Sequence, residues 1–433
     1  MALVSALDVH RAIDAVWRIE APRLIAGLTR LVRDVGVAED LAQDALEVAL
    51  RQWPESGVPN NPGAWLMATA KHRAIDRIRR NANLERKHQA LGRDLEAGER
   101  AAADAFDAAA DDDVGDDLLR LIFIACHPVL AAEARVALTL KLLGGLTTAE
   151  IARAFLVPEP TIAQRIVRAK RTLAEKRVAF EVPRGADRAA RLDSVLEVIY
   201  LVFNEGYSAT AGDDWLRPEL CDDALRLGRV LAGLAPGEPE AHGLVALMEL
   251  QASRLRARTG PEGVPILLLD QNRARWDRLL IRRGLAALAR AEGLAGADGL
   301  GPYALQAAIA ACHARARKAA ETDWPRIASL YEALAGRLPS PVVELNRAVA
   351  LGMAYGPAIA LARVESLAGE PSLQGYHLLP SVRGDLLAKL GRLDDARTAF
   401  EHAAELAGNA RDQALLRERA AACGRGESET SSP

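Results

Sequence analysis

The sequence is poor in aromatic residues, in cysteines and in long apolar runs. Aromatic residues make up 4% of the 433 residues, although half of the chain is hydrophobic, so Ala and Leu must supply most of the core, and this composition favours helices. No apolar run approaches the roughly 18–20 residues of a membrane span, and charge appears too early in the chain for a signal peptide. The cysteines lie far apart without a CxxC pair, which favours reduced thiols in the cytoplasm over a zinc site or a disulfide framework. These cysteines are Cys126, Cys221, Cys312 and Cys423.

Motifs of catalysis are also missing. The sequence has no ligand-spaced His/Glu set, no Gly-rich phosphate loop and no nucleophile elbow. The stretches "FNEGYSATAGDD" (203–214) and "DQNRARWD" (270–277) do contain carboxylates, but polar residues buried at helix crossings explain them more simply. We therefore expect a protein that is not an enzyme and that has no cofactor and no metal.

Charge is segregated along the chain, although the formal net charge is only −3. Between Asp94 and Asp117 there are ten acidic residues and one basic residue, which is typical of a solvated linker. We expect helices elsewhere, apart from the short run "VPILLL" (264–269), which has strand character. The predicted parts are 1–81, a linker at 82–117, 118–180, a joint at 181–189, a helical extension at 190–424 and a disordered tail at 425–433.

The stretch 146–177 has the pattern of a helix-turn-helix. Thr147 or Thr148 with Glu150 predicts a capped first helix, with Ile151 and Ala152 facing inward. "LVPEP" forms the turn, and Thr161 opens a second helix, whose apolar stripe is Ile162, Ile166 and Ala169 or Leu173. From Thr161 to Arg177 six residues are basic and one is acidic, as expected of a helix that reads base edges and contacts phosphates. The pattern predicts duplex DNA binding; an ordinary hairpin with a basic flank is the alternative.

The stretch "WLMATAKHRAIDRIRR" (65–80) predicts an amphipathic helix with an unusual polar face. Leu66, Met67, Ala70, Ala74, Ile75 and Ile78 form the core-facing stripe. The opposite face combines an aromatic ring with cations, which suits single-stranded nucleic acid. A hydrophobic cap at Trp65 and a solvated helix end at Arg79 and Arg80 are the alternatives. A loop at 54–63 ("PESGVPNNPG") precedes this helix.

The end of the chain contains a repeat. Counted from His377, Gly384, Leu387, Gly391, Ala396, Phe400 and Ala403 occupy the contact positions of a tetratricopeptide (TPR) helix pair. Counted from Pro341, 36 residues earlier, Ala348, Leu351, Ala360, Val364 and Leu367 are equivalent. We expect TPR-like repeats over about 324–408, with a non-repetitive bundle as the alternative.

Three blocks, taken in order, resemble the extracytoplasmic-function (ECF) sigma factors of bacterial RNA polymerase. "VAEDLAQDALEVAL" (37–50) is similar to regions 2.1–2.2, the helix at 65–80 to regions 2.3–2.4, and "LTTAEIARAFLVPEPTIAQRIVRAKRTL" (146–173) to region 4.2. The remainder resembles the TPR-like extension of one subgroup. Two positions depart from the family pattern: His72 stands where Asn is common and Leu46 where Phe is frequent, so particular base contacts would differ from those of the family.

The resemblance implies an all-α protein that directs transcription initiation. Residues 1–81 would be region 2 and residues 118–180 region 4, and the partners would be promoter DNA and the polymerase core through its β′ clamp and β flap. The residues implied for −10 recognition and melting are Trp65, Thr69, His72, Arg73, Asp76, Arg79 and Arg80. Those implied for the −35 element are Thr161, Gln164, Arg165, Arg168, Lys170 and Arg171. Those implied for polymerase binding are Glu39, Asp40, Gln43, Asp44 and Glu47.

Other interpretations stay open. A helix-turn-helix activator with a TPR sensor would bind duplex DNA without melting it, but it has no need of the block at 37–80. An enzyme and a scaffold in which only the repeats matter are weaker alternatives. For the extension we expect an in-chain regulatory role, through a protein partner or an intramolecular contact, with an interface around "FNEGY" and "DQNRARWD".

Overall fold

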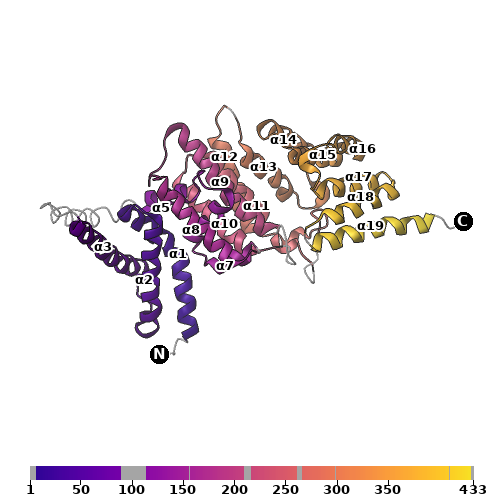
Figure 1. The fold of residues 1–433 in the computed structure, drawn as a ribbon. Helices are drawn as coiled ribbons and strands as arrows, with labels where there is room; N and C mark the ends of the chain where they lie inside the picture. The colour runs from indigo at the N-terminus through magenta and orange to yellow at the C-terminus, as the bar shows by residue number, and fades with distance from the viewer. Residues whose placement is uncertain are drawn as a thin grey trace. The chain divides into compact units, whose positions relative to one another are not determined.

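The computed structural model describes residues 6–88, 114–155, 157–208, 216–260, 266–297, 299–408 and 410–430, and Figure 1 shows their course. Side chains at 6–8, 10–11, 76–88, 114–116, 186 and 425–430 lie outside this description. Within these ranges the chain is helical and has no strand, and no helix is long and apolar enough to cross a bilayer. The chain forms two compact units, residues 1–199 and 200–433.

Three long helices begin the first unit: α1 (Ala6–Val32), α2 (Val35–Ser56) and α3 (Pro62–His88). Asp34 caps α2 by accepting a 2.9 Å hydrogen bond from the Val37 amide. The buried side of α2 is rich in alanine, which lets α1 and α3 approach closely. On α3, Leu66, Ala70 and Ala74 are buried as the period predicted. The loop predicted at 54–63 is shorter, because α2 continues through Pro54 to Ser56 and α3 already begins at Pro62.

The helix-turn-helix follows in the same unit. Its elements are α5 (Val114–Ala125), α6 (Ala132–Thr139), a π-helical turn (Leu140–Gly144), α7 (Thr148–Ala154) and α8 (Glu159–Glu175). The predicted capping box is confirmed: Thr147 Oγ1 accepts from the Glu150 amide at 3.1 Å, and the Glu150 carboxylate accepts from the Thr147 amide at 2.7 Å. The prediction that Thr161 opens the second helix is wrong by two residues, because Pro160 has the backbone angle that a first helical turn requires.

Helix α9 (Gly185–Tyr207) begins inside the stretch predicted as a joint, and the boundary between the two units falls within it. Its first half packs on the first unit. Ser194 donates a 2.6 Å hydrogen bond to the Cys126 carbonyl, and Arg191 donates one of 2.9 Å to the Phe123 carbonyl. Arg135 adds an ion pair with Glu197 at 2.9 Å. Residues 190–199 are therefore part of the first unit's structure.

The second unit begins with helices packed around α11. They are α10 (Pro218–Leu234), α11 (Pro239–Ala252), α12 (Arg278–Leu294), α13 (Pro302–Arg315) and α14 (Trp324–Arg337), with 3₁₀ turns at Leu255–Ala257, Arg273–Arg275 and Ala319–Glu321. Nearly every residue of α11 is buried, because α10, α12 and α13 cover it. Gly243 allows α13 to approach, since a Cβ there would lie 2.7 Å from the Ala304 nitrogen.

Paired helices complete the second unit, each packed on its neighbour in sequence. They are α15 (Pro341–Tyr355), α16 (Pro357–Ser366), α17 (Leu378–Lys389), α18 (Leu393–Leu406) and α19 (Ala410–Thr430), with a 3₁₀ turn at Pro371–Leu373 (Figure 1). Two of the contact positions named in the repeat lie against each other: a Cβ on Gly384 would lie 2.9 Å from the Phe400 ring. Ala348, Ala360, Val364 and Ala403 are buried in the same core.

Two local expectations differ from the structure. The part of "VPILLL" that is described forms no strand: Ile266 donates one 2.7 Å hydrogen bond to the Arg258 carbonyl, and the Asp270 amide then donates to the Leu267 carbonyl and closes a turn. Helix α19 extends to Thr430, into the stretch predicted as a disordered tail. Each added residue of a formed helix gains one hydrogen bond, so continuing α19 costs little.

Candidate nucleic-acid and polymerase interfaces

Trp65, the aromatic residue of the polar face of α3, rests on a second tryptophan. Its ring meets that of Trp53 edge to face, with centroids 5.3 Å apart and planes at 65°. Trp53 comes from the end of α2 and is 1% exposed, whereas Trp65 is half-buried. Edge-to-face pairs favour a fixed ring orientation, so Trp53 holds Trp65 in place. Sequence reasoning missed Trp53, although a tryptophan just before the 54–63 loop was a signal for it.

The other described members of this face lie near Trp65. The Thr69 hydroxyl donates to the Trp65 carbonyl at 2.9 Å, and His72 is exposed one turn further on. Arg73 forms an ion pair of 3.1 Å with Asp44 of α2, both side chains being partly exposed. This pair joins a residue proposed for DNA to one proposed for polymerase. The side chains of Asp76, Arg79 and Arg80 lie outside the described residues.

The acidic face of α2 divides into exposed and buried members. Asp40 and Glu47 are exposed, and Glu47 pairs with Arg51 at 3.2 Å. Glu39 is buried, and its carboxylate accepts a 2.6 Å hydrogen bond from Gln43. Asp40, Asp44 and Glu47 are therefore accessible to solvent, whereas Glu39 is covered.

On α8 the buried and exposed faces separate cleanly. Ile162, Ile166, Ala169 and Leu173 are all buried, which confirms the predicted apolar stripe. Gln164, Arg168 and Arg171 are exposed, Thr161 and Arg165 are half-buried, and Arg171 pairs with Glu175 at 2.6 Å. Ile151 and Ala152 of α7 are buried as predicted. The exposed face thus carries amide and guanidinium donors.

Lys170 differs from the rest of α8 because it points at α2. Its ammonium pairs with the buried Glu39 carboxylate, and Lys141 of the π-helical turn lies 3.7 Å from the same carboxylate. Two further pairs link the halves of the first unit: Arg18 with Glu150 at 2.9 Å and Arg30 with Asp117 at 3.2 Å. The structure therefore packs α8 against α2.

In the second unit Arg254 lies between the two carboxylate-bearing motifs of the sequence, with its guanidinium 5.8 Å from the ring centre of Tyr207 and 5.8 Å from that of Trp276. The guanidinium of Arg258 lies 3.6 Å from the Tyr207 ring centre, and that of Arg273 lies 4.9 Å from the Trp276 ring centre. Arg258, Arg273 and Trp276 are at most 7% exposed. Stacking and carbonyl contacts hold Arg273 and Trp276 in the core, so an interface around these motifs would use their exposed neighbours. Among the described residues no group of three or more His, Cys, Asp or Glu residues is placed to hold a metal ion.

Comparison with known proteins gives three matched segments of the chain. Residues 17–83 match sigma-70 region 2, residues 120–173 match sigma-70 region 4, and residues 191–292 match a family of unknown function, DUF6596. The two sigma-70 matches cover the three-helix part with α2 and α3 and the helix-turn-helix. These parts define a protein that binds promoter DNA as a subunit of RNA polymerase.

Similar proteins narrow the class. The chain is 30% identical to the ECF RNA polymerase sigma factor SigK of Mycobacterium ulcerans over 155 residues, which is 35% of this chain and 78% of that protein. It is 28% identical to the probable ECF RNA polymerase sigma factor SigI of Mycobacterium tuberculosis over 205 residues, 45% of this chain and 69% of that protein. Along nearly its full length it is similar to the uncharacterized protein R00370 of Rhizobium meliloti, with 45% identity over 94% of each chain.

The chain belongs to the ECF family of sigma-70 factors. Its role is that of a sigma factor, which directs RNA polymerase to promoters, and its partners are the polymerase core and promoter DNA. The helix-turn-helix activator without a melting function is not favoured, since residues 17–83 match region 2. A large helical part follows region 4.

Proposed function

We propose that α8 reads the −35 element through Thr161, Gln164, Arg165, Arg168 and Arg171. The observation that carries this proposal is the separation of its faces: an apolar stripe is buried while donor-rich side chains are exposed. Exposed Gln and Arg near the start of a recognition helix suit base edges in the major groove, and cations further along suit phosphates. Lys170 joins this set only when it leaves Glu39.

The face of α3 then holds the melted strand of the −10 element. Trp65 supplies a surface for an unstacked base, and its orientation by Trp53 supports this role because a fixed ring loses little freedom on binding. Thr69, His72 and Arg73 follow Trp65 on the same face and would contact the sugar-phosphate backbone next to the stacked base. Asp76, Arg79 and Arg80 belong to the same face by their period.

The acidic face of α2 contacts the β′ clamp, and region 4 contacts the β flap. Asp40, Gln43, Asp44 and Glu47 form the accessible part of the α2 face. Glu39 becomes available for polymerase only after its contacts with Lys141 and Lys170 break. Binding to polymerase therefore competes with the internal packing of residues 1–180. Such a complex forms where the polymerase is, in the cytoplasm.

The helical extension sets the activity of the sigma unit. We assign residues 1–81 to region 2, 82–117 to the linker, 118–180 to region 4 and the helical extension at 190–424, whose residues 190–199 pack on the first unit, to this regulatory part, with TPR-like repeats at about 324–408. Stacked helix pairs such as α15–α16 and α17–α18 support it, since repeats of this kind present grooves for a protein partner or for a segment of the same chain.

Run-off transcription with core polymerase tests both roles. The full-length chain is compared with a chain that ends after Tyr207, which keeps all of α9 and its contacts with Cys126 and Phe123. Promoter-specific transcripts from both chains, in different amounts, support a sigma unit regulated by its extension. Equal amounts would remove the regulatory role. The absence of any transcript, while the full-length chain binds core polymerase and duplex DNA, would count against the assigned −10 face.

A further inference from the structure

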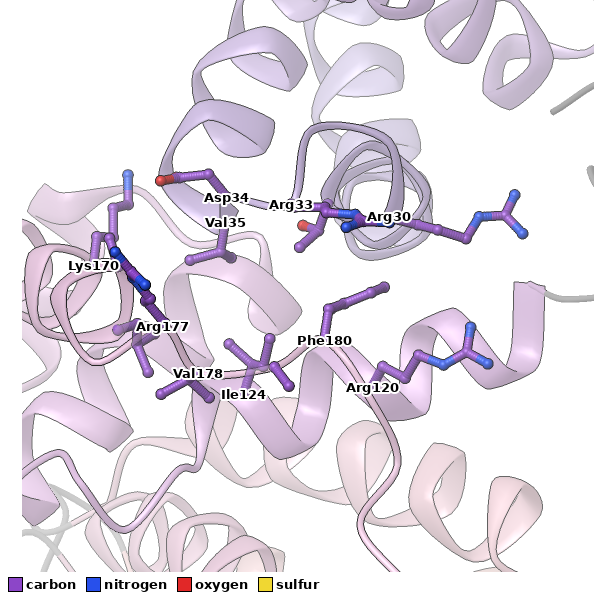
Figure 2. A pocket seen from close by; sticks show the side chains of 14 residues that line it. Arg30, Arg33, Asp34, Val35, Arg120, Ile124, Lys170, Arg177, Val178 and Phe180 are labelled. Carbon is purple, nitrogen blue, oxygen red and sulfur yellow. The ribbon is translucent and has the colours of Figure 1, made fainter. Parts of the chain in front are cut away.

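A cavity of about 700 Å³ lies within the first unit, where the end of α1 and the start of α2 face the end of α8. Five cationic side chains line it, against the one carboxylate of Asp34 among the described lining residues. Those cations are Arg30, Arg33, Arg120, Lys170 and Arg177. Figure 2 shows Ile124, Val178 and Phe180 between the pair Lys170 and Arg177 and the pair Arg30 and Arg120. The cavity therefore combines a basic rim with an apolar floor.

The positive charge of this rim is only partly balanced. Asp117 is buried and is shared by Arg30 and Arg120, with distances of 3.2 and 2.6 Å. The Asp34 carboxylate caps α2. Neither Arg33 nor Arg177 has an ion-pair partner among the described residues, and both are exposed. The rim thus keeps a net positive charge that an anion would neutralise.

The backbone at Arg33 and Arg177 provides an independent observation. Both have positive φ, 54° and 50°, and they are the non-glycine residues with this property in the described ranges. Each follows the end of a helix, where glycine is the unstrained residue. Arg33 and Arg177 therefore occupy two backbone positions at which glycine would be less strained. Both residues line the same cavity. Strained residues of this kind gather at ligand sites.

We propose that this cavity binds a small phosphate-bearing molecule with an aromatic part, of the class of nucleoside diphosphates. Guanidinium groups match phosphate oxygens in two-point contacts, which favours phosphate over other anions. Val35, Ile124, Leu173, Val178 and Phe180 offer an apolar surface that an inorganic anion would not use. The volume lies within the roughly 300–1,000 Å³ of small-molecule sites.

Such a ligand would favour the packed form of the first unit, an inference that rests on the sigma function proposed above. The cavity takes its lining from region 2 (Arg30, Arg33) and from region 4 (Lys170, Arg177). A promoter separates the elements read by these regions by roughly 25 base pairs, about 85 Å of B-DNA at 3.4 Å per pair. Because α2 and α8 are in contact in the packed form, that form cannot engage both elements. The ligand and productive promoter binding are therefore mutually exclusive.

Titration calorimetry of the full-length chain with ADP and with inorganic pyrophosphate tests the site directly, without polymerase. The variants are Arg33→Gly and Arg177→Gly, because glycine removes the charge and suits the positive φ, so the fold is kept. We expect saturable ADP binding that each substitution weakens at least about tenfold, as for the loss of one charge-assisted hydrogen bond. Arg23→Ala, an exposed arginine of α1 outside the cavity, is the matched control and should bind ADP as the wild type does.

Linkage provides a second readout. A ligand that binds only the packed form weakens core-polymerase binding by the factor 1 + [L]/Kd, about elevenfold at ten times its Kd. Absence of saturable ADP binding, or equal ADP affinity in the wild type and both glycine variants, would overturn the proposal. Pyrophosphate binding as tight as ADP binding would overturn the role of the apolar floor. If a single-stranded oligonucleotide alone bound at these arginines, the site would belong to nucleic acid. All of these outcomes leave the sigma function itself untouched.

Discussion

Lys170 of α8 lies with its ammonium on the carboxylate of Glu39, a buried residue of α2. The two residues are 131 positions apart in the sequence, and Lys141 lies on the other oxygen of the carboxylate. One carboxylate therefore holds two cations of region 4 against region 2. In the proposed function, this contact must break before Glu39 can bind polymerase.

Glu39→Gln should weaken this packing. The substitution keeps the shape of the side chain but leaves Lys141 and Lys170, each about a fifth exposed, without their counterion. We expect the free energy of unfolding of the first unit to fall by about 2–3 kcal/mol, less than the roughly 3–5 kcal/mol of a fully buried pair, because the lysines retain some solvent. The first transition in urea unfolding measures it. Glu47→Gln, an exposed acid of the same helix, is the control, and equal midpoints for the two variants would contradict the prediction.

Trp65→Ala should slow open-complex formation more than initial promoter binding. Stacking is gained only after a base leaves the duplex, and it contributes roughly 1–3 kcal/mol per base. Permanganate footprinting of promoter thymines measures the melting. Trp65→Phe keeps a ring on Trp53 and should retain most of the reactivity. Thymine reactivity of Trp65→Ala equal to that of the wild type would exclude this role for the ring.

Arg168→Ala should weaken promoter binding and leave binding to core polymerase unchanged. The side chain is exposed on α8 opposite the buried stripe, so its removal does not disturb packing. Loss of one base or phosphate contact corresponds to about 1–3 kcal/mol, and Arg165→Ala should behave alike. Fluorescence anisotropy with −35 duplex DNA at physiological salt measures it. Arg51→Ala, which removes an exposed arginine of α2, is the control. The assignment fails if Arg168→Ala and Arg51→Ala bind the −35 duplex with equal affinity.

Gly384→Ala should destabilise the C-terminal helix pairs. A Cβ at this position would lie 2.9 Å from the Phe400 ring, so α17 and α18 would have to separate. Overpacking of this kind costs about 1–3 kcal/mol. Gly336→Ala on α14 is the matched control, because no atom lies within 4 Å of its Cβ position and alanine favours a helix by about 0.5–1 kcal/mol. The midpoint of thermal unfolding should fall for Gly384→Ala and rise for Gly336→Ala. A rise for both variants would argue against close packing at Gly384.

His313 should make the second unit sensitive to mild acid. Burial, followed by the nearby Arg254 and Arg273 charges, lowers the pKa of its ring from 6.5 to about 4. Below pH 6.5 His313 is therefore protonated in the unfolded chain, whereas in the folded chain it stays neutral down to about pH 4. Stability is full above pH 6.5 and is lost as the pH falls through this window, by about 3 kcal/mol in total.

His313→Phe keeps a ring against Trp324, whose centre lies 5.2 Å away, and removes the titration. Urea unfolding followed from pH 7 to pH 4.5 should show a flatter decline for this variant than for the wild type. His402→Phe, at an exposed position on α18, should keep the steep decline. If the wild type and His313→Phe declined in parallel, another group would have to carry the acid sensitivity.

Short-range patterns in the sequence determined the helices, the capping box at Thr147 and Glu150 and the buried stripe of α8. Each of these depends on residues three or four positions apart, and the helix period fixes such neighbours before any tertiary contact forms. The order of the blocks at 37–50, 65–80 and 146–173 likewise sufficed for the family. The repeat pattern also predicted a longer contact, in which Gly384, which has no Cβ, meets the ring of Phe400 sixteen positions later.

Only the tertiary structure decided that Glu39 is buried against Lys170, that Trp53 lies under Trp65, and that Arg33 and Arg177 line one cavity. The helix period assigns a residue to a face of its own helix, but it does not say which distant segment covers that face. A glutamate on a polar face reads as solvated until a lysine from another part of the chain meets it. Burial, ion pairing and a cavity between helices depend on how separate helices pack, and local sequence does not encode that packing.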